Sequence, residues 1–388
     1  MYDTWHHHTT TILEISMKRA YYVSIILISV MGCRKPYNPP AITGNGSYLV
    51  VEGVINSGPD STTIKLSRTV NVSSKVTTNP VLNALVTVVN DQGATFPLIE
   101  ATNGNYVSAG LNLDNSHAYR LNITTADNKK YQSDLTPVTI TPPIDSIGYN
   151  IINSAIDTGI QIYANAHDAT SQIKYFRWDY EEAWSFHAKF GTDFISNGYA
   201  IVARTPAQQI TYCYANDVSS NIVLGSTAKL QQDIIDQNTI IFIPSTSEKI
   251  ESEYSILVRQ YALTADAYNF WVSLKKNTEQ LGSIFDAQPT QLQGNIHCIT
   301  NPSEPVIGYV SVCTVPSKRI FILNLKLPNW APAYPYVCQL DSVKRSPVNL
   351  ITLPNYNIPL DGGGKTYSTV PCVDCTIRGT ITPPPFWK

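Results

Sequence analysis

A chain of 388 residues is long enough for two domains, and a hydrophobic fraction of 43% allows each to bury a core. Only 14% of the residues are charged and the formal net charge is −2. This composition excludes a charge-rich coiled coil or disordered tail, and the absence of a basic surplus excludes a general nucleic-acid binder. The 23 Tyr and 25 Pro favour strands and turns, and the seven Cys are an odd number.

Residues 1–32 are predicted to comprise an upstream stretch and a lipoprotein signal peptide. From Met17, the true start in this interpretation, a basic pair precedes an apolar run. The run is too short for a membrane span, which needs about 20 apolar residues. It ends in Val-Met-Gly-Cys, which resembles a lipobox, so Cys33 is the predicted lipidation site. The mature chain would then have 388 − 32 = 356 residues.

Residues 33–47 are rich in Pro, Gly and Asn, and this composition predicts an extended, lipidated tether. Residues 48–143 are predicted to form an Ig-like or transthyretin-like β-sandwich, because short runs of β-branched and aromatic residues alternate with Gly and Asn turns. The predicted strands are 48–55, 62–67, 85–89, 95–99, 104–107, 119–123 and 130–133.

Residues 144–388 are predicted to form a larger β-rich domain with one or two helices. Alternation places Phe176, Trp178 and Tyr180 on one face of a strand. A helix is expected near 264–281, where Thr264 can serve as the N-cap and apolar residues recur with a period near 3.6. Its apolar stripe favours packing against a sheet.

Six cysteines remain after Cys33, and in an exported chain they predict three structural disulfides. The preferred pair is Cys298 with Cys313, on either side of an expected hairpin through 301–305. Residues 372–375 form a C-x-x-C, for which a redox pair or half of a zinc site are the alternatives. The disulfide candidates are Cys213, Cys298, Cys313, Cys338, Cys372 and Cys375.

No catalytic, cofactor-binding or metal-binding residue is predicted. His167 and Asp168 are adjacent on a predicted strand, so their side chains are expected on opposite faces. The same geometry separates Glu181 from Glu182, for which a solvated edge is expected. Residues 361–366 superficially resemble a phosphate-binding loop but lack its first Gly and following helix, so a flexible loop is expected. The aromatic residues could line a sugar or peptide platform, or could simply fill the core.

The chain resembles the Bacteroidota outer-membrane lipoprotein family known as domain of unknown function 4249. The resemblance rests on Cys33 and on short segments in the same order along the chain. These segments are 48–53, 64–69, 142–147, 175–182, 276–282, 288–289, 294–296, 305–309, 372–379 and 385–387. The family contributes no catalytic residues. The resemblance implies a lipoprotein often encoded beside TonB-dependent transporters, with an accessory or binding role.

The predicted function is therefore that of a non-enzymatic, lipid-anchored outer-membrane protein. It would contact the membrane through its N-terminal lipid and would bind a ligand or partner, notably a TonB-dependent transporter. Neither the ligand nor the membrane face follows from the residues. Two alternatives remain open, namely a glycan- or peptide-processing hydrolase and a purely structural envelope lipoprotein.

Overall fold

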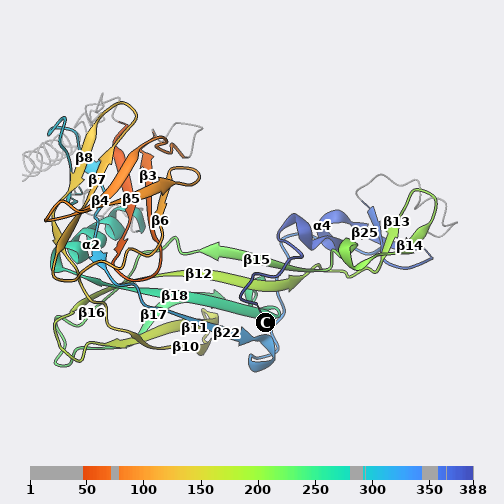
Figure 1. Ribbon diagram of the computed structural model, residues 1–388. Helices are drawn as coiled ribbons and strands as arrows, with labels where there is room; N and C mark the ends of the chain where they lie inside the picture. The colour runs from red at the N-terminus through yellow and green to blue at the C-terminus, as the bar shows by residue number, and fades with distance from the viewer. Residues whose placement is uncertain are drawn as a thin grey trace, which may run out of the picture. The chain divides into compact units, whose positions relative to one another are not determined.

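The computed structural model describes residues 47–70, 78–279, 292, 294–342, 357–363 and 365–387. Strands make up most of the regular structure, which confirms the prediction of a mainly β chain (Figure 1). The predicted signal peptide, Cys33 and most of the tether lie outside these residues. In the described part of the chain, no helix combines the length and the apolar character needed to cross a membrane.

The N-terminal part of the chain builds one ten-stranded sheet. Along it the order is β19-β8-β7-β4-β5-β6-β3-β1-β20, and β9 pairs with β7 off this path. Its strands are β1 (Leu49–Gly53), β3 (Thr62–Arg68), β4 (Leu85–Asn90), β5 (Thr95–Glu100), β6 (Asn105–Ser108), β7 (Ala118–Thr124), β8 (Lys130–Ser133), β9 (Thr136–Pro137), β19 (Ile296–Cys298) and β20 (Val306–Ile307).

This sheet does not confirm the sandwich predicted for residues 48–143. Its strands follow one hydrogen-bonded path that nearly closes on itself, in place of two separate facing sheets. It also includes β19 and β20 from much later in the chain, and β20 runs parallel to β1. The short strands β2 (Ile55–Asn56) and β21 (Val312–Cys313) pair in the same parallel sense. Residues 296–313, expected in the C-terminal domain, therefore return to the N-terminal sheet.

Local sequence explains the strands of this sheet. In β3, Ile64 and Leu66 are buried while the residues between them face solvent, as period-2 alternation predicts. Burying a side chain of this size contributes about 1.5–3 kcal/mol. The predicted hairpin after β4 is confirmed, because the Asn90 side chain accepts hydrogen bonds from the backbone N–H groups of Gln92 and Ala94 and turns the chain into β5.

Two further sheets pack face to face in the C-terminal part. One has the order β10-β11-β17 and the other β15-β12-β18-β22, with β16 also pairing with β12. Their strands are β10 (Ile144–Asn153), β11 (Thr158–His167), β12 (Tyr175–His187), β15 (Tyr212–Val218), β16 (Val223–Ser226), β17 (Ile234–Pro244), β18 (Glu253–Leu263) and β22 (Ser317–Leu323).

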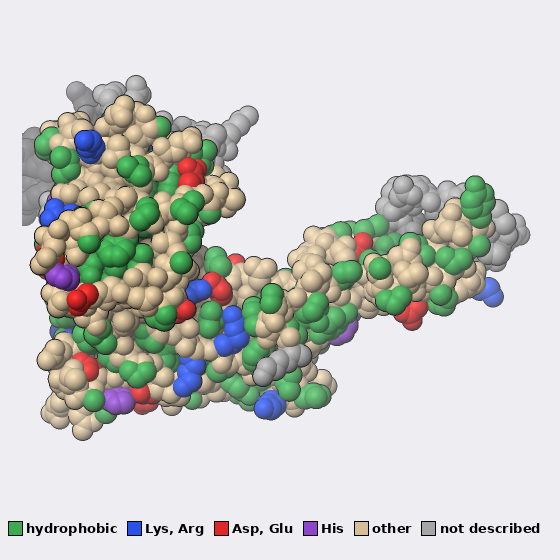
Figure 2. All heavy atoms as spheres, in the orientation of Figure 1, with side chains coloured by type: hydrophobic (Ala, Val, Ile, Leu, Met, Phe, Trp, Pro, Cys, Tyr) green, Lys and Arg blue, Asp and Glu red, His purple; other side chains and the backbone are tan. Residues whose placement is uncertain are grey.

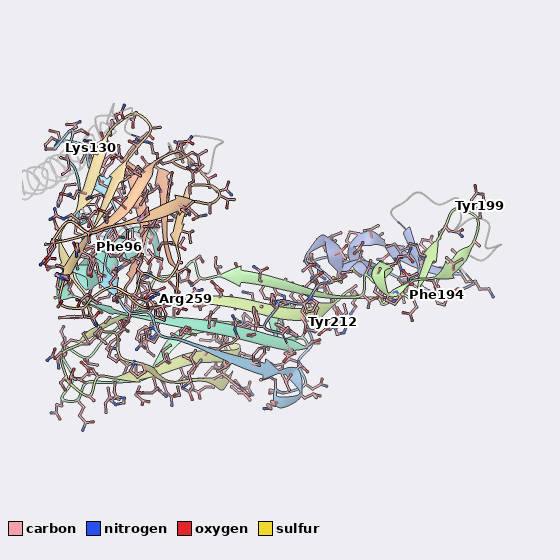
Figure 3. The ribbon with its side chains drawn as sticks, viewed as in Figure 1. Phe96, Lys130, Phe194, Tyr199, Tyr212 and Arg259 are labelled. Carbon is pink, nitrogen blue, oxygen red and sulfur yellow. A yellow bond between two sulfur atoms is a disulfide. The ribbon has the colours of Figure 1, made fainter. Side chains whose placement is uncertain are left out.

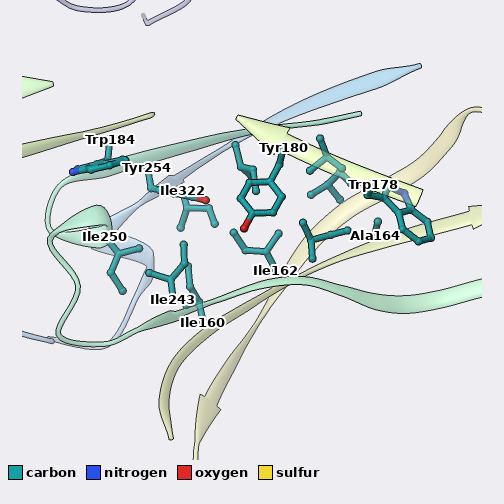
Figure 4. Close-up of a cluster of buried hydrophobic side chains, with 14 of the residues drawn as sticks. Ile160, Ile162, Ala164, Trp178, Tyr180, Trp184, Ile243, Ile250, Tyr254 and Ile322 are labelled. Atoms are coloured by element: carbon teal, nitrogen blue, oxygen red, sulfur yellow. The ribbon is translucent and has the colours of Figure 1, made fainter. Parts of the chain in front are cut away.

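The apolar core of this part comes from the inner faces of both sheets (Figure 4). Phe176, Trp178 and Tyr180 all belong to it, which confirms the predicted alternation of β12. They meet Ile160 and Ile162 of β11 across the interface. Strand β12 is central, since β15 and β16 pair with one of its edges and β18 with the other. Its long alternating run is therefore the main support of the second core.

The predicted helix is confirmed as α2 (Ala265–Glu279). Thr264 acts as the N-cap, since its hydroxyl accepts a hydrogen bond from the backbone N–H of Ala267 at 3.2 Å. The buried side chains of Ala267 and Phe270 face inward. Together with Trp271, the helix packs against β12, β16 and β18 as the apolar stripe indicated. Gly282, a residue type that commonly follows the end of a helix, lies outside the described residues.

The remaining elements are short. Four are single turns of 3₁₀ helix, and the others cluster around the C-terminal cysteines. They are β13 (Phe194–Ser196), β14 (Ile201–Ala203), η1 (Pro206–Gln208), η2 (Glu248–Ile250), η3 (Asn324–Lys326), β23 (Asp341–Ser342), β24 (Asn357–Pro359), β25 (Thr366–Thr369), α4 (Val370–Val373) and η4 (Cys375–Ile377).

Candidate functional site

Three segments of chain build what we term the cystine lobe, defined as the described residues of 189–211, 336–342 and 357–375. The hairpin β13–β14 contacts β24, and β24 and β23 flank β25 (Figure 1). Hydrogen bonds join the stretches, with the Thr192 hydroxyl donating to the carbonyl of Pro359 at 2.6 Å and the Phe190 N–H donating to the carbonyl of Cys372 at 3.0 Å. The lobe is thus assembled by contacts between residues far apart in sequence.

Two disulfides fasten this lobe. Cys213 of β15 bonds Cys375, with 5.8 Å between their Cα atoms, and Cys338 bonds Cys372, with a Cα separation of 5.6 Å. The cysteines of the C-x-x-C therefore do not bond each other. Each instead joins its short helical turn to a different neighbour. The first bond attaches the lobe to the large C-terminal sheet, and the second closes the loop that carries Cys338.

The predicted disulfide between Cys298 and Cys313 is wrong, because both thiols are free and buried. The expected hairpin between them does not form. Cys298 ends β19, which pairs with β8, whereas Cys313 ends β21, which pairs with β2. The two side chains consequently enter different apolar clusters. Burial raises the pKa of the Cys313 thiol to about 11, which keeps it protonated and unreactive at neutral pH.

The cystine lobe exposes several large apolar side chains. Tyr199, at the tip of β13–β14, is 89% exposed, and Val337, next to Cys338, is 91% exposed. Figure 3 shows Tyr199 pointing away from the hairpin. Tyr336 and Leu340 add exposed apolar area beside Val337. On the face drawn in Figure 2, apolar side chains outnumber charged ones over this region. Tyr336, Val337 and Leu340 lie within five residues of one another, and exposed apolar side chains that are grouped can mark protein–protein contact surfaces.

Glu182 is a buried group whose position the sequence did not reveal. Its side chain is only 2% exposed, on the inner face of β12, so the expected solvated edge is wrong for this residue. Lys249 Nζ lies 2.6 Å from one carboxylate oxygen, and the Tyr254 hydroxyl donates to the other at 2.6 Å. Burial, and then the negative charge of Glu182, raise the pKa of Tyr254 well above its usual value. The phenol therefore stays a donor at physiological pH.

The two adjacent glutamates do diverge, as strand geometry requires. Glu181 lies on the outer face of β12 and pairs with Arg259 of β18. Arg259 also contacts Asp179 at 3.3 Å, and the Tyr261 hydroxyl donates to the same carboxylate at 2.6 Å. Two acids, an arginine and a phenol thus satisfy one another. No paired-carboxylate site of the kind that glycosidases use is formed by Glu181 and Glu182.

An arginine links this outer face to α2. The Arg177 guanidinium lies 4.3 Å from the ring centroid of Tyr261 and 4.4 Å from that of Trp271. Arg177 also lies 3.7 Å from a carboxylate oxygen of Asp179. Cation–π contacts at such distances are worth about 1–2 kcal/mol when partly desolvated. Alternating charged residues along β12 were the sequence signal for this cluster, and its role is to hold the helix on the sheet.

His117, His167, His187 and His297 each lie beside one acid. His167 pairs with Asp145 across β10–β11 at 2.7 Å, not with its neighbour Asp168, as the strand geometry predicted. The other pairs, with distances, are His117 with Asp91 (2.8 Å), His297 with Asp134 (3.0 Å) and His187 with Glu251 (3.9 Å). Within the described ranges, no three His, Cys, Asp or Glu side chains are grouped so that they could hold a metal ion.

The Gly-rich loop that superficially resembles a phosphate site is closed by its own acid. The Asp361 carboxylate accepts hydrogen bonds from the backbone N–H groups of Lys365 at 3.1 Å and Thr366 at 2.7 Å. The Thr366 hydroxyl also donates to it, and these donors lower the pKa of Asp361 to about 2. A carboxylate therefore occupies the place that a bound phosphate would need.

The aromatic residues after Glu182 belong to the core. Trp184 and Phe186 are buried between the two C-terminal sheets, so they do not form an open stacking platform. On β15, the partly exposed Tyr212 lies beside His187, and Tyr214 lies against Trp387. Trp387 also contacts Phe321 of β22, so the C-terminal segment covers part of this sheet.

One pocket of about 330 Å³ lies where the N-terminal sheet leads into the C-terminal sheets. Its polar groups already bond one another, since the Thr141 N–H donates to the Thr314 hydroxyl at 2.9 Å. The lining residues are Asn56, Gly58, Pro59, Asp60, Thr141, Pro143, Thr314, Val315 and Pro316.

One family model, described as a domain of unknown function (DUF4249), matches residues 34–319. The chain belongs to this family. The match covers both sheet regions and ends within β22, so the last three cysteines lie beyond it. None of the curated proteins compared with the chain matches it.

Proposed function

We propose that this DUF4249 protein is a lipid-anchored, non-enzymatic binding protein of the outer membrane. In this proposal the cystine lobe holds a partner protein, namely a TonB-dependent transporter. The observation that carries the proposal is that the exposed apolar residues Tyr336, Val337 and Leu340 lie within five positions, on a lobe that also exposes Tyr199 and is fastened by two disulfides. Exposed apolar side chains are costly in a free protein unless a partner covers them.

The disulfides support this interpretation because they reduce the cost of binding. Ordering loops and side chains at an interface costs about 0.5–1.5 kcal/mol for each rotamer-rich side chain that becomes fixed. A lobe that carries two cross-links has less chain entropy to lose on binding than the same lobe without them. The Cys213–Cys375 bond also attaches the lobe to β15 of the large sheet, so a partner bound to the lobe is covalently connected to the C-terminal sheets.

The lipid anchor supports the same proposal from the sequence. A lipid on Cys33 would keep the chain in the plane of the membrane that contains the transporter. Confinement raises the effective concentration of both proteins, so a modest interface is sufficient. The anchor and the lobe would each bind weakly, and together they would give a higher overall affinity than either alone.

Site-specific photo-crosslinking in intact cells tests the proposal. A photoreactive phenylalanine analogue is placed at Tyr199 or Val337 and, as matched controls, at Ile156 or Leu325, which are 91% and 94% exposed outside the lobe. We expect both lobe positions to crosslink to a transporter-sized outer-membrane protein and the controls not to do so. Equal labelling from all four positions would contradict a specific interface. Absence of any adduct would favour the structural-lipoprotein alternative.

A further inference from the structure

The two disulfides of the cystine lobe differ sharply in accessibility. Cys213 and Cys375 are completely buried, and both belong to the apolar core of the C-terminal sheets. Cys372 is buried as well. Cys338, in contrast, is only half-buried and follows the 91% exposed Val337. Cys338 is therefore the one cysteine of these four that is not buried.

The backbone around Cys338 is also lightly held. Residues 328–340 form no helix or strand. The nearest tie to the rest of the lobe is the Ser368 hydroxyl, which donates to the carbonyl of Gln339 at 2.7 Å. Cys213, by comparison, lies within β15 and pairs with Phe186 of β12. Access and local opening both favour the same disulfide.

From this difference we propose that Cys338 is a site of thiol–disulfide exchange with an external dithiol protein, and that the Cys338–Cys372 bond is a reversible tether. The thiolate of the external protein attacks Cys338 Sγ and forms a mixed disulfide. The bond to Cys372 Sγ breaks, and Cys372 leaves with the electron pair. Attack at Cys338 is favoured because exchange needs in-line access to a sulfur.

Thr369 is positioned to assist this step. Its hydroxyl lies 3.5 Å from Cys372 Sγ and donates to it. A donor at the leaving sulfur stabilises the developing thiolate, and a better leaving thiolate speeds exchange. The second thiol of the external protein then attacks the mixed disulfide and releases Cys338. The external dithiol is oxidised to a disulfide, and Cys338 and Cys372 each take a proton from solvent.

The consequence is local. Reduction removes the covalent link between residues 336–340 and α4, while β23 stays paired with β25 and the buried Cys213–Cys375 bond keeps η4 attached to β15. The apolar side chains of Tyr336, Val337 and Leu340 lie on the segment that loses this link. The exchange reaction does not rest on the proposed partner-binding function. If that function holds, the redox state of the tether would control partner binding.

The test treats the detergent-solubilised full chain with a thioredoxin-type dithiol protein, followed by alkylation and peptide mass spectrometry. We expect Cys338 and Cys372 to become alkylated at least about tenfold faster than Cys213 and Cys375. Equal rates for the two bonds, or faster loss of Cys213–Cys375, would overturn the proposal.

A trapping variant of the dithiol protein, which lacks its second cysteine, identifies the attacked sulfur. The covalent adduct is expected on Cys338, and an adduct on Cys372 would refute the direction of attack. Thr369→Val is expected to slow exchange severalfold, and Thr369→Ser, which keeps the hydroxyl, to restore it. If both variants exchange at the wild-type rate, Thr369 does not assist.

Discussion

The stability of the C-terminal sheets is expected to depend on the ion pair between Lys249 and the buried Glu182 of β12. Lys249→Met removes the ammonium that lies 2.6 Å from Glu182 and leaves a carboxylate that is 2% exposed inside the sandwich. Only the neutral Tyr254 hydroxyl would remain as a donor. Removing one partner of a buried ion pair costs about 3–5 kcal/mol. Lys249 is itself 22% exposed, so we expect the lower end of this range, roughly 3 kcal/mol.

The double variant Glu182→Gln/Lys249→Met tests whether the loss of stability in Lys249→Met comes from the unpaired charge on Glu182. Without the charge at 182 the unpaired-carboxylate penalty disappears. The amide can still accept the hydrogen bond from Tyr254. We therefore expect the double variant to be more stable than Lys249→Met by roughly 2 kcal/mol, since two neutral partners avoid the desolvation of an isolated charge.

Equilibrium unfolding in urea, followed by tryptophan fluorescence, measures these differences as shifts of the midpoint at constant slope. The matched control is Lys65→Met, because Lys65 and Glu52 form a surface pair at 3.0 Å with about half of each side chain exposed. We expect the control to cost less than about 0.5 kcal/mol. A Lys249→Met loss as small as that of the control, or a double variant less stable than the single one, would refute the reasoning.

Replacing both Cys213 and Cys375 with Ala opens a loop that spans 162 residues. We expect the free energy of unfolding to fall by up to about 5 kcal/mol, measured by thermal unfolding under oxidising conditions. A change below about 1 kcal/mol would contradict this expectation. Burial raises the pKa of Asp168, but donated hydrogen bonds outweigh it and bring the value to about 2, so its stabilisation is present above about pH 4 and is lost as the pH falls through 2. Asp168→Asn should therefore be less stable than wild type at pH 7 and approach it near pH 2, and a difference independent of pH would be evidence against this. Cys33→Ala should move the protein from the membrane to the soluble fraction after cell fractionation, whereas continued membrane binding would rule out the lipid anchor.

Much of the local structure follows from the sequence alone. The alternation of Phe176, Trp178 and Tyr180 predicts their common face, because successive side chains of a strand point to opposite sides. Thr264 marks the start of α2, and Asn90 marks a hairpin turn, because caps and turns depend on residues within a few positions. Each of these features depends on short-range geometry that the chain carries with it.

The tertiary structure alone decides which distant strands become neighbours. Cys298 and Cys313 are close in sequence, yet β19 and β21 join different sheets, whereas Cys213 meets Cys375 across 162 residues. Glu182 is buried for the same kind of reason. Strand β12 has a partner strand on each edge and a second sheet over its inner face. Glu182, which was expected at a solvated edge, therefore lies in the core. Pairing between strands is a non-local property, because many registers and neighbours satisfy the same alternation, and only the packing of the whole chain selects one.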